Sequence, residues 1–310
     1  MELNHLMTVF YNIPIKYKIL GSFNSLKNKI MWFNLYRKTY SNYFNVILND
    51  LQNNYPIKAV LQNNETKILK SKDEIALYAL LTEHDNVNYD EKNDYALFDL
   101  SNLNFGLKEI KLYGIKQNLD ALLAFNDGTY EKLPLKNKLV VDVGACTGDT
   151  SIYFAICGAK KVIAIEPYPK NFEMLEKNIE INHLEKLINI KLAGCASESS
   201  YITIDPNFKS TMRSNLKEFE TGIKIPLVSL IDIIKDEDFT DGILKLDCEG
   251  CEYDVILESS KSLLQKFSHI QIEYHMGYEN IKQKLESCGF KVNVIKIENS
   301  KMGHLLAQKY

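Results

Sequence analysis

The sequence predicts an α/β fold in which a mostly parallel β-sheet is covered by helices on both faces. From Tyr113 onwards, short apolar runs alternate with stretches in which apolar residues recur at helical spacing. Strands that alternate with helices form parallel pairs, because each helix carries the chain back across a face of the sheet. A glycine-containing turn after the first long apolar run supports the same fold class.

Each predicted strand is a short apolar run bounded by polar or turn-forming residues. The predicted strands cover residues 139–143, 161–165, 188–192, 243–246, 269–274, 291–297 and 304–308, and a shorter run, 122–125, precedes the turn Asn126-Asp127-Gly128. Helices are predicted between most of them, over residues 150–155, 170–181, 252–266 and 279–287. The last two strands follow each other without a helix, which predicts a terminal hairpin.

Residues 1–104 differ from the rest of the chain, being rich in Asn, Tyr and Lys. Apolar spacing predicts helical structure within 30–51, and Ser71 followed by Glu74 predicts a capped helix over 73–82. A small hairpin is expected from 57–60 and 66–69. We therefore predict a mainly helical accessory region, 1–104, and an α/β domain, 105–310. The first region is expected to act as a cap, as a homo-oligomer contact or in substrate selection.

The composition is that of an ordinary soluble globular protein, with 45% hydrophobic and 25% charged residues. The net charge of −3 gives no general attraction to nucleic acid or to an anionic membrane. No apolar stretch is long enough for a membrane span, and residues 1–20 lack the features of a signal peptide. A cytoplasmic protein is expected, with reduced thiols at Cys146, Cys157, Cys195, Cys248, Cys251 and Cys288.

The segment 139–150 is typical of a strand, a tight turn and the first residues of a helix. Gly144 and Gly148 bracket the turn, where glycine permits a close approach of a ligand to the backbone. The next predicted strand ends at Glu166-Pro167, which places Glu166 18 residues after Gly148. An acid at this position can accept hydrogen bonds from both hydroxyls of a ribose. A nucleoside-bearing cofactor is therefore expected.

The residues around the turn favour one class of cofactor. A nicotinamide or flavin dinucleotide would require a third glycine and a helix start free of acids. Here acids stand on both sides of the turn, at Asp142 and Asp149. Two carboxylates repel a pyrophosphate, whereas the ammonium and sulfonium groups of S-adenosylmethionine are compatible with acids. S-adenosylmethionine is therefore the predicted cofactor. The motif of a P-loop is not present in the sequence.

Three motifs in the same order resemble the FkbM family of methyltransferases: Val141-Asp142-Val143-Gly144-Ala145-x-x-Gly148-Asp149-Thr150, Glu166-Pro167-x-Pro169-x-x-Phe172-x-x-Leu175-x-x-Asn178 and Lys245-Leu246-Asp247-Cys248-Glu249-Gly250-Cys251-Glu252. The segment Pro226-Leu227-Val228-Ser229-Leu230 and the strand end Glu273-Tyr274-His275 also fit. The similarity spans about residues 138–298 and does not cover the first hundred residues.

The resemblance implies a Rossmann-like class I methyltransferase fold, a seven-stranded, mostly parallel sheet whose last strand is antiparallel. It also implies methyl transfer to a hydroxyl of a sugar, a glycan or a small metabolite. Cys146, Cys248 and Cys251 depart from the residues usual in the family. The expected cofactor-binding residues are Asp142, Gly144, Ala145, Cys146, Gly148, Glu166 and Pro167, with Ala196 and Ser197 near the adenine by family position.

Acidic residues and a histidine follow two of the predicted strands. Asp247 and Glu249 come directly after 243–246, Glu252 opens the next helix, and His275 ends the neighbouring strand. A hydroxyl is a weak nucleophile until a base accepts its proton. We therefore predict Asp247 and His275 as the base or as substrate-orienting groups, with Glu249 and Glu252 supporting them.

Other interpretations of these residues remain open at this point. Asp247, Glu249, Glu273 and His275 suit Mg²⁺ or Mn²⁺, although their spacing does not require a metal and none is predicted. Cys248 and Cys251 are expected to be packing residues, because neither zinc ligation nor a thioredoxin-like pattern is supported. Residues 209–213 are either a solvated loop or a contact for an anionic or sugar substrate.

Three other functions compete with methyl transfer to a hydroxyl. A nicotinamide-dependent oxidoreductase is disfavoured by the glycine spacing. A nucleic-acid methyltransferase is disfavoured because the fourth strand is followed by acids, which repel phosphate, and lacks an Asn/Asp-Pro-Pro-aromatic motif. A non-catalytic cofactor-binding or scaffold protein would bind the cofactor without turnover.

Overall fold

The structure is a computed structural model that describes residues 26–102, 105–205, 216, 218–297, 299 and 301–310. The chain divides into two compact units, Met1–Tyr89 and Asp90–Tyr310. The strand β3 (Val87–Asp90) lies at the division. The second unit also includes β4 (Tyr95–Asp99), which the sequence analysis grouped with the N-terminal region.

The first unit contains three described helices and a hairpin. These are α2 (Leu26–Thr39), α3 (Tyr43–Leu51), β1 (Ile57–Val60), β2 (Thr66–Leu69) and α4 (Lys72–Glu83). The predicted hairpin is confirmed, with Ile57 opposite Leu69. The predicted cap of the last helix is confirmed too, because the Ser71 hydroxyl accepts a hydrogen bond from the Glu74 N–H at 3.3 Å. The interior of this unit is lined by Tyr40, Val46, Ile57, Ala59, Leu69 and Ile75.

The predicted helical stretch within 30–51 is divided between two helices, because α2 ends at Thr39 and α3 begins at Tyr43. Between α2 and α3 the chain turns at Asn42, whose side chain bonds to β1 instead of to a helix. The Asn42 amide donates to the Lys58 carbonyl at 2.9 Å and accepts from the Val60 N–H at 2.8 Å. Asparagine side chains compete in this way with helical hydrogen bonds.

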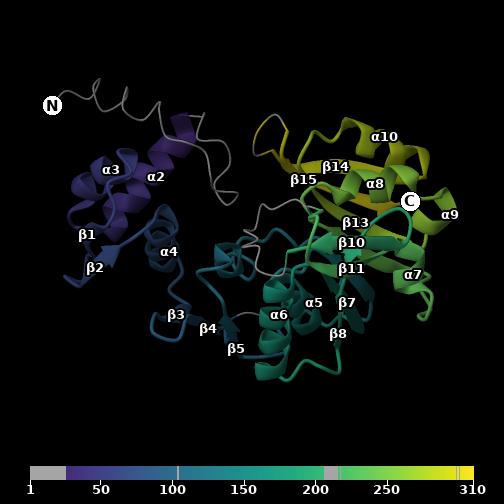
Figure 1. The fold of residues 1–310 in the computed structure, drawn as a ribbon, viewed down its shortest axis with the longest axis horizontal. Coiled ribbons are helices and arrows are strands. Elements are labelled where there is room, and N and C mark those ends of the chain that lie inside the picture. Colours follow the sequence, from purple (N-terminus) through teal and green to yellow (C-terminus); the bar gives the residue numbers. More distant parts are fainter. Residues whose placement is uncertain (1–25, 103–104, 206–215, 217, 298, 300) are drawn as a thin grey trace. The chain divides into compact units, whose positions relative to one another are not determined.

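A seven-stranded sheet forms the centre of the second unit, in the order β14-β15-β13-β12-β6-β7-β8. Figure 1 labels β7, β8, β13, β14 and β15 of this sheet. Its strands are β6 (Leu139–Val143), β7 (Lys161–Glu166), β8 (Ile188–Leu192), β12 (Gly242–Leu246), β13 (Phe267–Tyr274), β14 (Phe290–Ile297) and β15 (Gly303–Lys309). All seven predicted strands from 139 onwards are present. The last strand, β15, pairs antiparallel with both β13 and β14, which confirms the terminal hairpin and the antiparallel last strand.

Helices lie beside this sheet, as the alternating pattern predicts. They are α5 (Asp149–Ile156), α6 (Pro169–Ile181), α7 (Leu230–Ile234), α8 (Cys251–Glu258), α9 (Lys261–Leu264) and α10 (Glu279–Ser287). The helix predicted over 252–266 is in fact two helices. Ser259 takes an extended conformation, and the Ser260 hydroxyl caps α9 by accepting from the Leu263 N–H at 3.2 Å.

Some elements of the second unit were not predicted. The run 122–125 is not a strand, because Leu122 ends a 3-10 helix (Leu119–Leu122) capped by Asn118 and the residues after it form turns. A separate three-stranded sheet has the order β10-β11-β9, formed by β10 (Ser200–Ile204), β11 (Ile223–Val228) and β9 (Gly194–Cys195). The strand β4 pairs antiparallel with β5 (Glu109–Tyr113).

The order of strands places a topological switch point at β6. From β6 the chain proceeds to β7 and β8 on one side, and β12 later pairs with β6 on the other side. In open parallel sheets a ligand lies beyond the carboxyl ends of the strands at such a point. The two segments that leave these ends begin with Gly144 and Asp247.

Among the described residues, the structure contains no helix that combines the length and the apolar character needed to cross a membrane.

Candidate active site

The turn between β6 and α5 is held by its backbone in a conformation that requires glycine. The N–H groups of Gly144 and Ala145 both donate to the Ile165 carbonyl at 3.0 Å. Positive φ angles occur at Gly144 (79°), Cys146 (47°) and Gly148 (94°). Gly148 caps α5 from this left-handed conformation, where a side chain would be strained.

Gly144 also lies directly against the segment that follows β12. A Cβ atom added to Gly144 would lie 1.8 Å from the Asp247 carbonyl oxygen and 2.7 Å from its carbon. The Asp247 N–H in turn donates to the Val143 carbonyl at 3.1 Å. The expected cofactor turn and the expected acceptor segment are therefore in direct backbone contact.

Glu166 ends β7 as a buried acid whose carboxylate faces the turn. One oxygen accepts from the Cys146 N–H at 3.0 Å, and the other accepts from the Tyr168 N–H at 2.9 Å and the Asn171 amide at 3.2 Å. Burial raises the pKa of Glu166 to about 7, although these hydrogen bonds oppose the shift. The acid predicted as the ribose ligand thus already connects the turn to the start of α6.

The raised pKa of Glu166 gives a testable pH dependence of cofactor affinity. We expect S-adenosylhomocysteine to bind more weakly as the pH falls below about 7, by up to about tenfold per pH unit, because a protonated acid accepts fewer hydrogen bonds. Calorimetric titrations on both sides of that pH measure the effect. Without ligand, the same shift favours the folded state at low pH, and this contribution is lost as the pH rises through about 7.

The matched control is Glu166→Gln, which cannot titrate at this position. Burial also raises the pKa of the neighbouring Asp149 to about 6, so part of the dependence in the wild type can come from that residue. An equal pH dependence in Glu166→Gln and in the wild type would show that Glu166 is not its source.

Asp142 does not project toward solvent but lies inside the domain. Both the Thr150 and the Ser151 hydroxyls donate to one carboxylate oxygen at 2.6 Å. The other oxygen lies 3.0 Å from the Nζ atom of Lys245, and both side chains are buried. Asp142, predicted from the sequence as a cofactor-binding residue, therefore joins β6, α5 and β12 beneath the turn.

A second buried network fixes the far side of the turn. The Asn118 amide donates to the Thr147 hydroxyl at 2.9 Å and to the Asp149 carboxylate at 2.8 Å. The Asn178 amide donates to the Thr147 carbonyl at 2.8 Å. Asn118 and Thr147 were not singled out from the sequence, because their pairing depends on contacts between segments about thirty residues apart.

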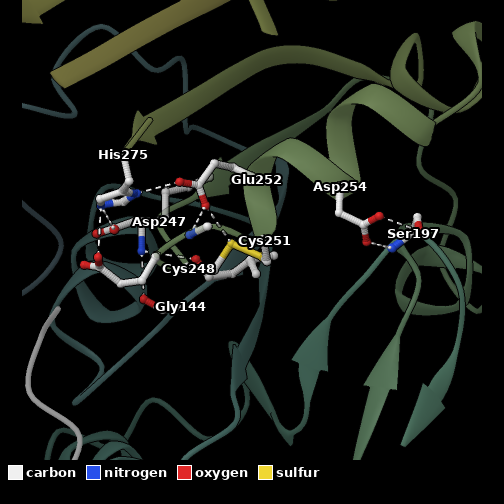
Figure 2. The surroundings of a disulfide bond; sticks show 12 residues. Gly144, Ser197, Asp247, Cys248, Cys251, Glu252, Asp254 and His275 are labelled. Carbon is white, nitrogen blue, oxygen red and sulfur yellow. Dashed lines mark hydrogen bonds and ion pairs between the residues drawn. A yellow bond between two sulfur atoms is a disulfide. The ribbon is translucent and has the colours of Figure 1, made fainter. Parts of the chain in front are cut away.

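The residues expected near the adenine lie on the segment that follows β9. The Ala196 N–H donates to the Val228 carbonyl at 3.1 Å. The Ser197 N–H and hydroxyl both donate to Asp254 on α8, at 2.7 and 2.9 Å. Figure 2 shows this pair at a distance from His275, on the other side of α8.

His275 is brought together with all three other residues predicted as catalytic. Figure 2 shows His275 beside Asp247 and Glu252. Its Nε2 atom lies 3.4 Å from Glu249, 3.7 Å from Glu273 and 3.8 Å from Asp247. Its Nδ1 atom lies 2.5 Å from a carboxylate oxygen of Glu252. The imidazole thus lies among four carboxylates at the carboxyl ends of β12 and β13, and its side chain is only 9% exposed.

Two further contacts fix the orientation of His275. A carboxylate can only accept a hydrogen bond, so Nδ1 carries the hydrogen that is shared with Glu252, and Nε2 faces the other acids. The Tyr253 hydroxyl accepts from the His275 and Met276 N–H groups at 3.2 and 2.6 Å and donates to the Gly277 carbonyl at 2.7 Å. Successive residues of α8 therefore hold both the ring and the backbone of His275.

Cys248 and Cys251 form a disulfide next to these acids (Figure 2). The expectation of reduced packing cysteines is therefore wrong for this pair, whereas Cys146, Cys157, Cys195 and Cys288 are free thiols. Positive φ angles at Glu249 (58°) and Gly250 (126°) fold the chain back and bring the two Cα atoms to 5.5 Å, within the range of disulfides. The disulfide encloses Glu249 and adjoins Asp247 and Glu252.

Reduction of this disulfide is expected to destabilise the domain. A dithiol such as dithiothreitol should lower the free energy of unfolding by about 2 kcal/mol, the entropy estimate for so short a closed loop. Chemical denaturation with and without reductant measures the change, and mass spectrometry after alkylation reports the state of the pair.

The double variant Cys248→Ser/Cys251→Ser is the control and should not respond to dithiothreitol. Equal stability of the oxidised and reduced wild type, with the pair shown by alkylation to be reduced, would contradict the prediction.

Two more residues near the site were missed in the sequence. Lys245 lies within a fully buried strand. A charged residue among the apolar residues of a predicted strand was the feature of the sequence that could have indicated its role. Tyr130 follows the predicted turn at 126–128. Burial and the nearby carboxylates of Asp247 and Asp142 raise the pKa of the Tyr130 hydroxyl well above its usual value. No spacing in the sequence indicated that this tyrosine reaches the acids.

The possibility of a metal also has a structural counterpart. Among the residues that the structure describes, Asp247, Glu249 and His275 offer ligand atoms that all lie within 4.8 Å of one another. Residues 209–213, considered above as a substrate contact, lie outside the described residues.

An α/β domain with a glycine turn and a strand-ending acid at its switch point belongs to the class of nucleoside-cofactor-binding proteins. Residues 142–292 match the model of the methyltransferase FkbM domain. The matched segment, just under half of the chain, is similar to the methyltransferase domains of the FkbM family, and the cofactor is S-adenosylmethionine. The nicotinamide alternative is therefore wrong.

Solved structures with a similar arrangement share little sequence with this chain. A methyltransferase FkbM from Methylobacillus flagellatus KT is 18% identical with a TM-score of 0.39, over 56% of this chain and 44% of that chain. A ribosomal protein L11 methylase from Lactobacillus delbrueckii subsp. bulgaricus is 16% identical with a TM-score of 0.38, over 64% of this chain and 80% of that chain. A precorrin-6y C5,15-methyltransferase from Geobacter metallireducens GS-15 is 12% identical with a TM-score of 0.37, over 60% of this chain and 88% of that chain.

The residues around the turn fit this cofactor. Gly144 lies directly against the Asp247 backbone, where a Cβ would collide with the Asp247 carbonyl, so the turn and the segment after β12 meet at the switch point. Glu166 presents a carboxylate beside the turn, and carboxylates accept hydrogen bonds from ribose hydroxyls. Asp142, Asp149 and Asp247 supply negative charge, which suits a ligand that carries an ammonium and a sulfonium.

Proposed function

We propose that this methyltransferase transfers the methyl group to a hydroxyl of a sugar, a glycan or a small metabolite. The observation that carries this proposal is the position of His275 among four carboxylates, one of which belongs to Asp247, whose backbone lies against Gly144 of the turn. A hydroxyl needs a base at the reacting oxygen, whereas an already nucleophilic acceptor such as a thiolate does not.

The residues have separate roles in this mechanism. When bound, S-adenosylmethionine supplies a methyl group activated by the sulfonium. Nε2 of His275 accepts the proton of the acceptor hydroxyl, and Glu252 holds the ring through Nδ1. Asp247, Glu249 and Glu273 stabilise the imidazolium that forms, because each carboxylate lies within 4 Å of Nε2. Asp247 and Glu249 also orient the acceptor by accepting its hydrogen bonds.

The cofactor is held by the turn and by the two strand ends around it. We assign Gly144, Ala145, Cys146 and Gly148 to backbone contacts and Glu166 to the ribose. Asp142 acts beneath the turn, by fixing β6 to α5, and Pro167, Ala196 and Ser197 border the adenine.

The decisive experiment is a screen with S-adenosylmethionine labelled with ¹³C in its methyl group. Monosaccharides, glycans and hydroxylated metabolites are compared with matched amines and thiols. Release of S-adenosylhomocysteine gives the rate, and the ¹³C chemical shift of the product separates a methyl ether from an N-methyl or S-methyl group.

A labelled methyl ether, formed without added metal and in the presence of a chelator, supports the proposal. Methylation confined to amines or thiols overturns it. Loss of activity on chelation, restored by Mg²⁺, would assign Asp247, Glu249 and His275 to a cation instead of to proton transfer.

A further inference from the structure

Lys245 is a buried cation that the mechanism above does not use. It is the last residue but one of β12, and every residue of that strand is buried. The side chain of Lys245 is 3% exposed. Removing an ammonium from water is costly unless it is paired and hydrogen-bonded, so its contacts account for its presence.

The ammonium of Lys245 connects β12 to the cofactor turn. Nζ donates to the Gly144 carbonyl at 2.9 Å and to the Val143 carbonyl at 3.4 Å. It lies 3.0 Å from the Asp142 carboxylate, and Lys245 is the register partner of Asp142 in the parallel pair of β12 and β6. One buried charge therefore touches the backbone of the turn and the acid beneath it.

Acids approach this ammonium from several elements. Asp142 belongs to β6, Asp149 opens α5, Asp247 follows β12, and Glu166 ends β7. Burial lowers the pKa of Lys245, but Asp142 and Asp247 outweigh burial and raise it, so the side chain is charged. Lys245 in turn lowers the pKa values of Asp149 and Glu166, against the effect of burial. The ammonium is thus a central positive charge among four carboxylates.

We propose that Lys245 is a specificity-determining residue of the cofactor site. Its ammonium holds the Gly144 carbonyl and offsets the negative charge of the acids around the turn. It thereby limits the preference of the site for S-adenosylmethionine over S-adenosylhomocysteine. This inference depends on the identity of the cofactor, S-adenosylmethionine, and not on the proposed identity of the methyl acceptor.

The physical reason is the charge that disappears during methyl transfer. S-adenosylmethionine carries one more positive charge than S-adenosylhomocysteine, and the sulfonium loses its charge as the methyl group leaves. Acids around the site stabilise the charged sulfonium of the bound cofactor more than they stabilise the transition state, in which this charge is already decreasing. Such stabilisation of the ground state raises the free-energy barrier to methyl transfer. A fixed positive charge beneath the turn reduces this unproductive stabilisation.

The test compares the affinities of the two ligands in variants that change one buried charge. In Lys245→Met, the ratio of the S-adenosylhomocysteine Kd to the S-adenosylmethionine Kd should rise by about threefold to tenfold, the range that Coulomb's law gives for any two unit charges about 10 Å apart at an effective dielectric constant of about 25–50. Calorimetry at about pH 8.5 keeps Glu166, whose pKa is about 7, ionised. In Lys245→Arg, where the charge remains, the ratio should stay within about twofold of the wild type.

Asp142→Asn gives an opposite expectation and keeps the proposal testable if Lys245→Met does not fold. This variant removes a negative charge and leaves Lys245, so the ratio should fall by about threefold to tenfold. Lys138→Met is the control for net charge, because Lys138 pairs with Asp241 just before β6, at the opposite end of the strand. It should leave the ratio unchanged.

Equal weakening of both ligands in Lys245→Met would show that Lys245 only supports the structure of the turn, and would overturn the proposal. An unchanged ratio in Asp142→Asn would overturn it as well. Both outcomes are independent of whether the acceptor is a hydroxyl, because no acceptor is present in these titrations.

Discussion

Replacing His275 with glutamine is expected to slow methyl transfer by about a hundredfold to ten-thousandfold, the range that general-base catalysis contributes. Glutamine retains polar contacts near Glu252 but does not accept a proton at neutral pH. The affinity for S-adenosylhomocysteine should stay within about twofold, because the hydrogen bonds and ion pairs of His275 described above join it to α8 and to acids at the ends of β12 and β13. Turnover of the best acceptor from the screen, with calorimetry of the product, measures both quantities.

His269→Gln is the matched control, because His269 lies on the same strand, β13, near its other end. Its ring lies 3.1 Å from the Ser268 hydroxyl. This variant should keep nearly full activity. An increase in KM with an unchanged kcat in His275→Gln would show that His275 only binds the acceptor. The proton would then have to go to another group, such as Asp247, which the sequence predicts as the alternative base.

Replacing Gly144 with alanine is expected to lower the free energy of unfolding by about 3–5 kcal/mol, the sum of overpacking and an unfavourable backbone conformation. The added Cβ would lie 1.8 Å from the Asp247 carbonyl oxygen, and both partners are backbone, so neither can move away by rotating a side chain. Cofactor affinity should fall by more than about a hundredfold, because the turn must shift. Urea denaturation and calorimetric titration measure the two losses.

Gly158→Ala separates backbone strain from the close contact. Gly158 also has a positive φ, 92°, but an added Cβ would lie 3.8 Å from atoms of Lys136, which is an ordinary contact distance. This variant should lose only about 1 kcal/mol and should bind the cofactor normally. If the two variants are equally stable and bind equally well, the contact between Gly144 and Asp247 does not govern the site.

Local patterns predicted most of the central sheet, because its strands are short apolar runs that end at the residues of the site. The glycines of the turn, Glu166 at the end of β7 and His275 after β13 could all be placed by their position after a strand. The small sheet of β9, β10 and β11 was missed because two of its strands carry many exposed or half-buried residues, without a clear apolar run.

Contacts between distant segments could not be predicted in the same way. Lys245 pairs with Asp142 only because β12 lies beside β6 in one particular register. The Cys248–Cys251 disulfide depends on the left-handed conformation of Glu249, which is uncommon for a residue with a Cβ. Both features require knowledge of the backbone that residue spacing does not contain.

The first turn of α8 has a consequence for the order in which ligands act. Glu252 and Asp254 are two residues apart and so point about 200° apart around the helix, one toward His275 and the other toward Ser197 (Figure 2). A displacement of this short helix by an acceptor therefore changes the surroundings of both residues. By thermodynamic linkage, an acceptor that alters the affinity for the cofactor through α8 has its own affinity altered by the same factor. Cooperative binding of the two substrates is the consequence that we expect from this helix.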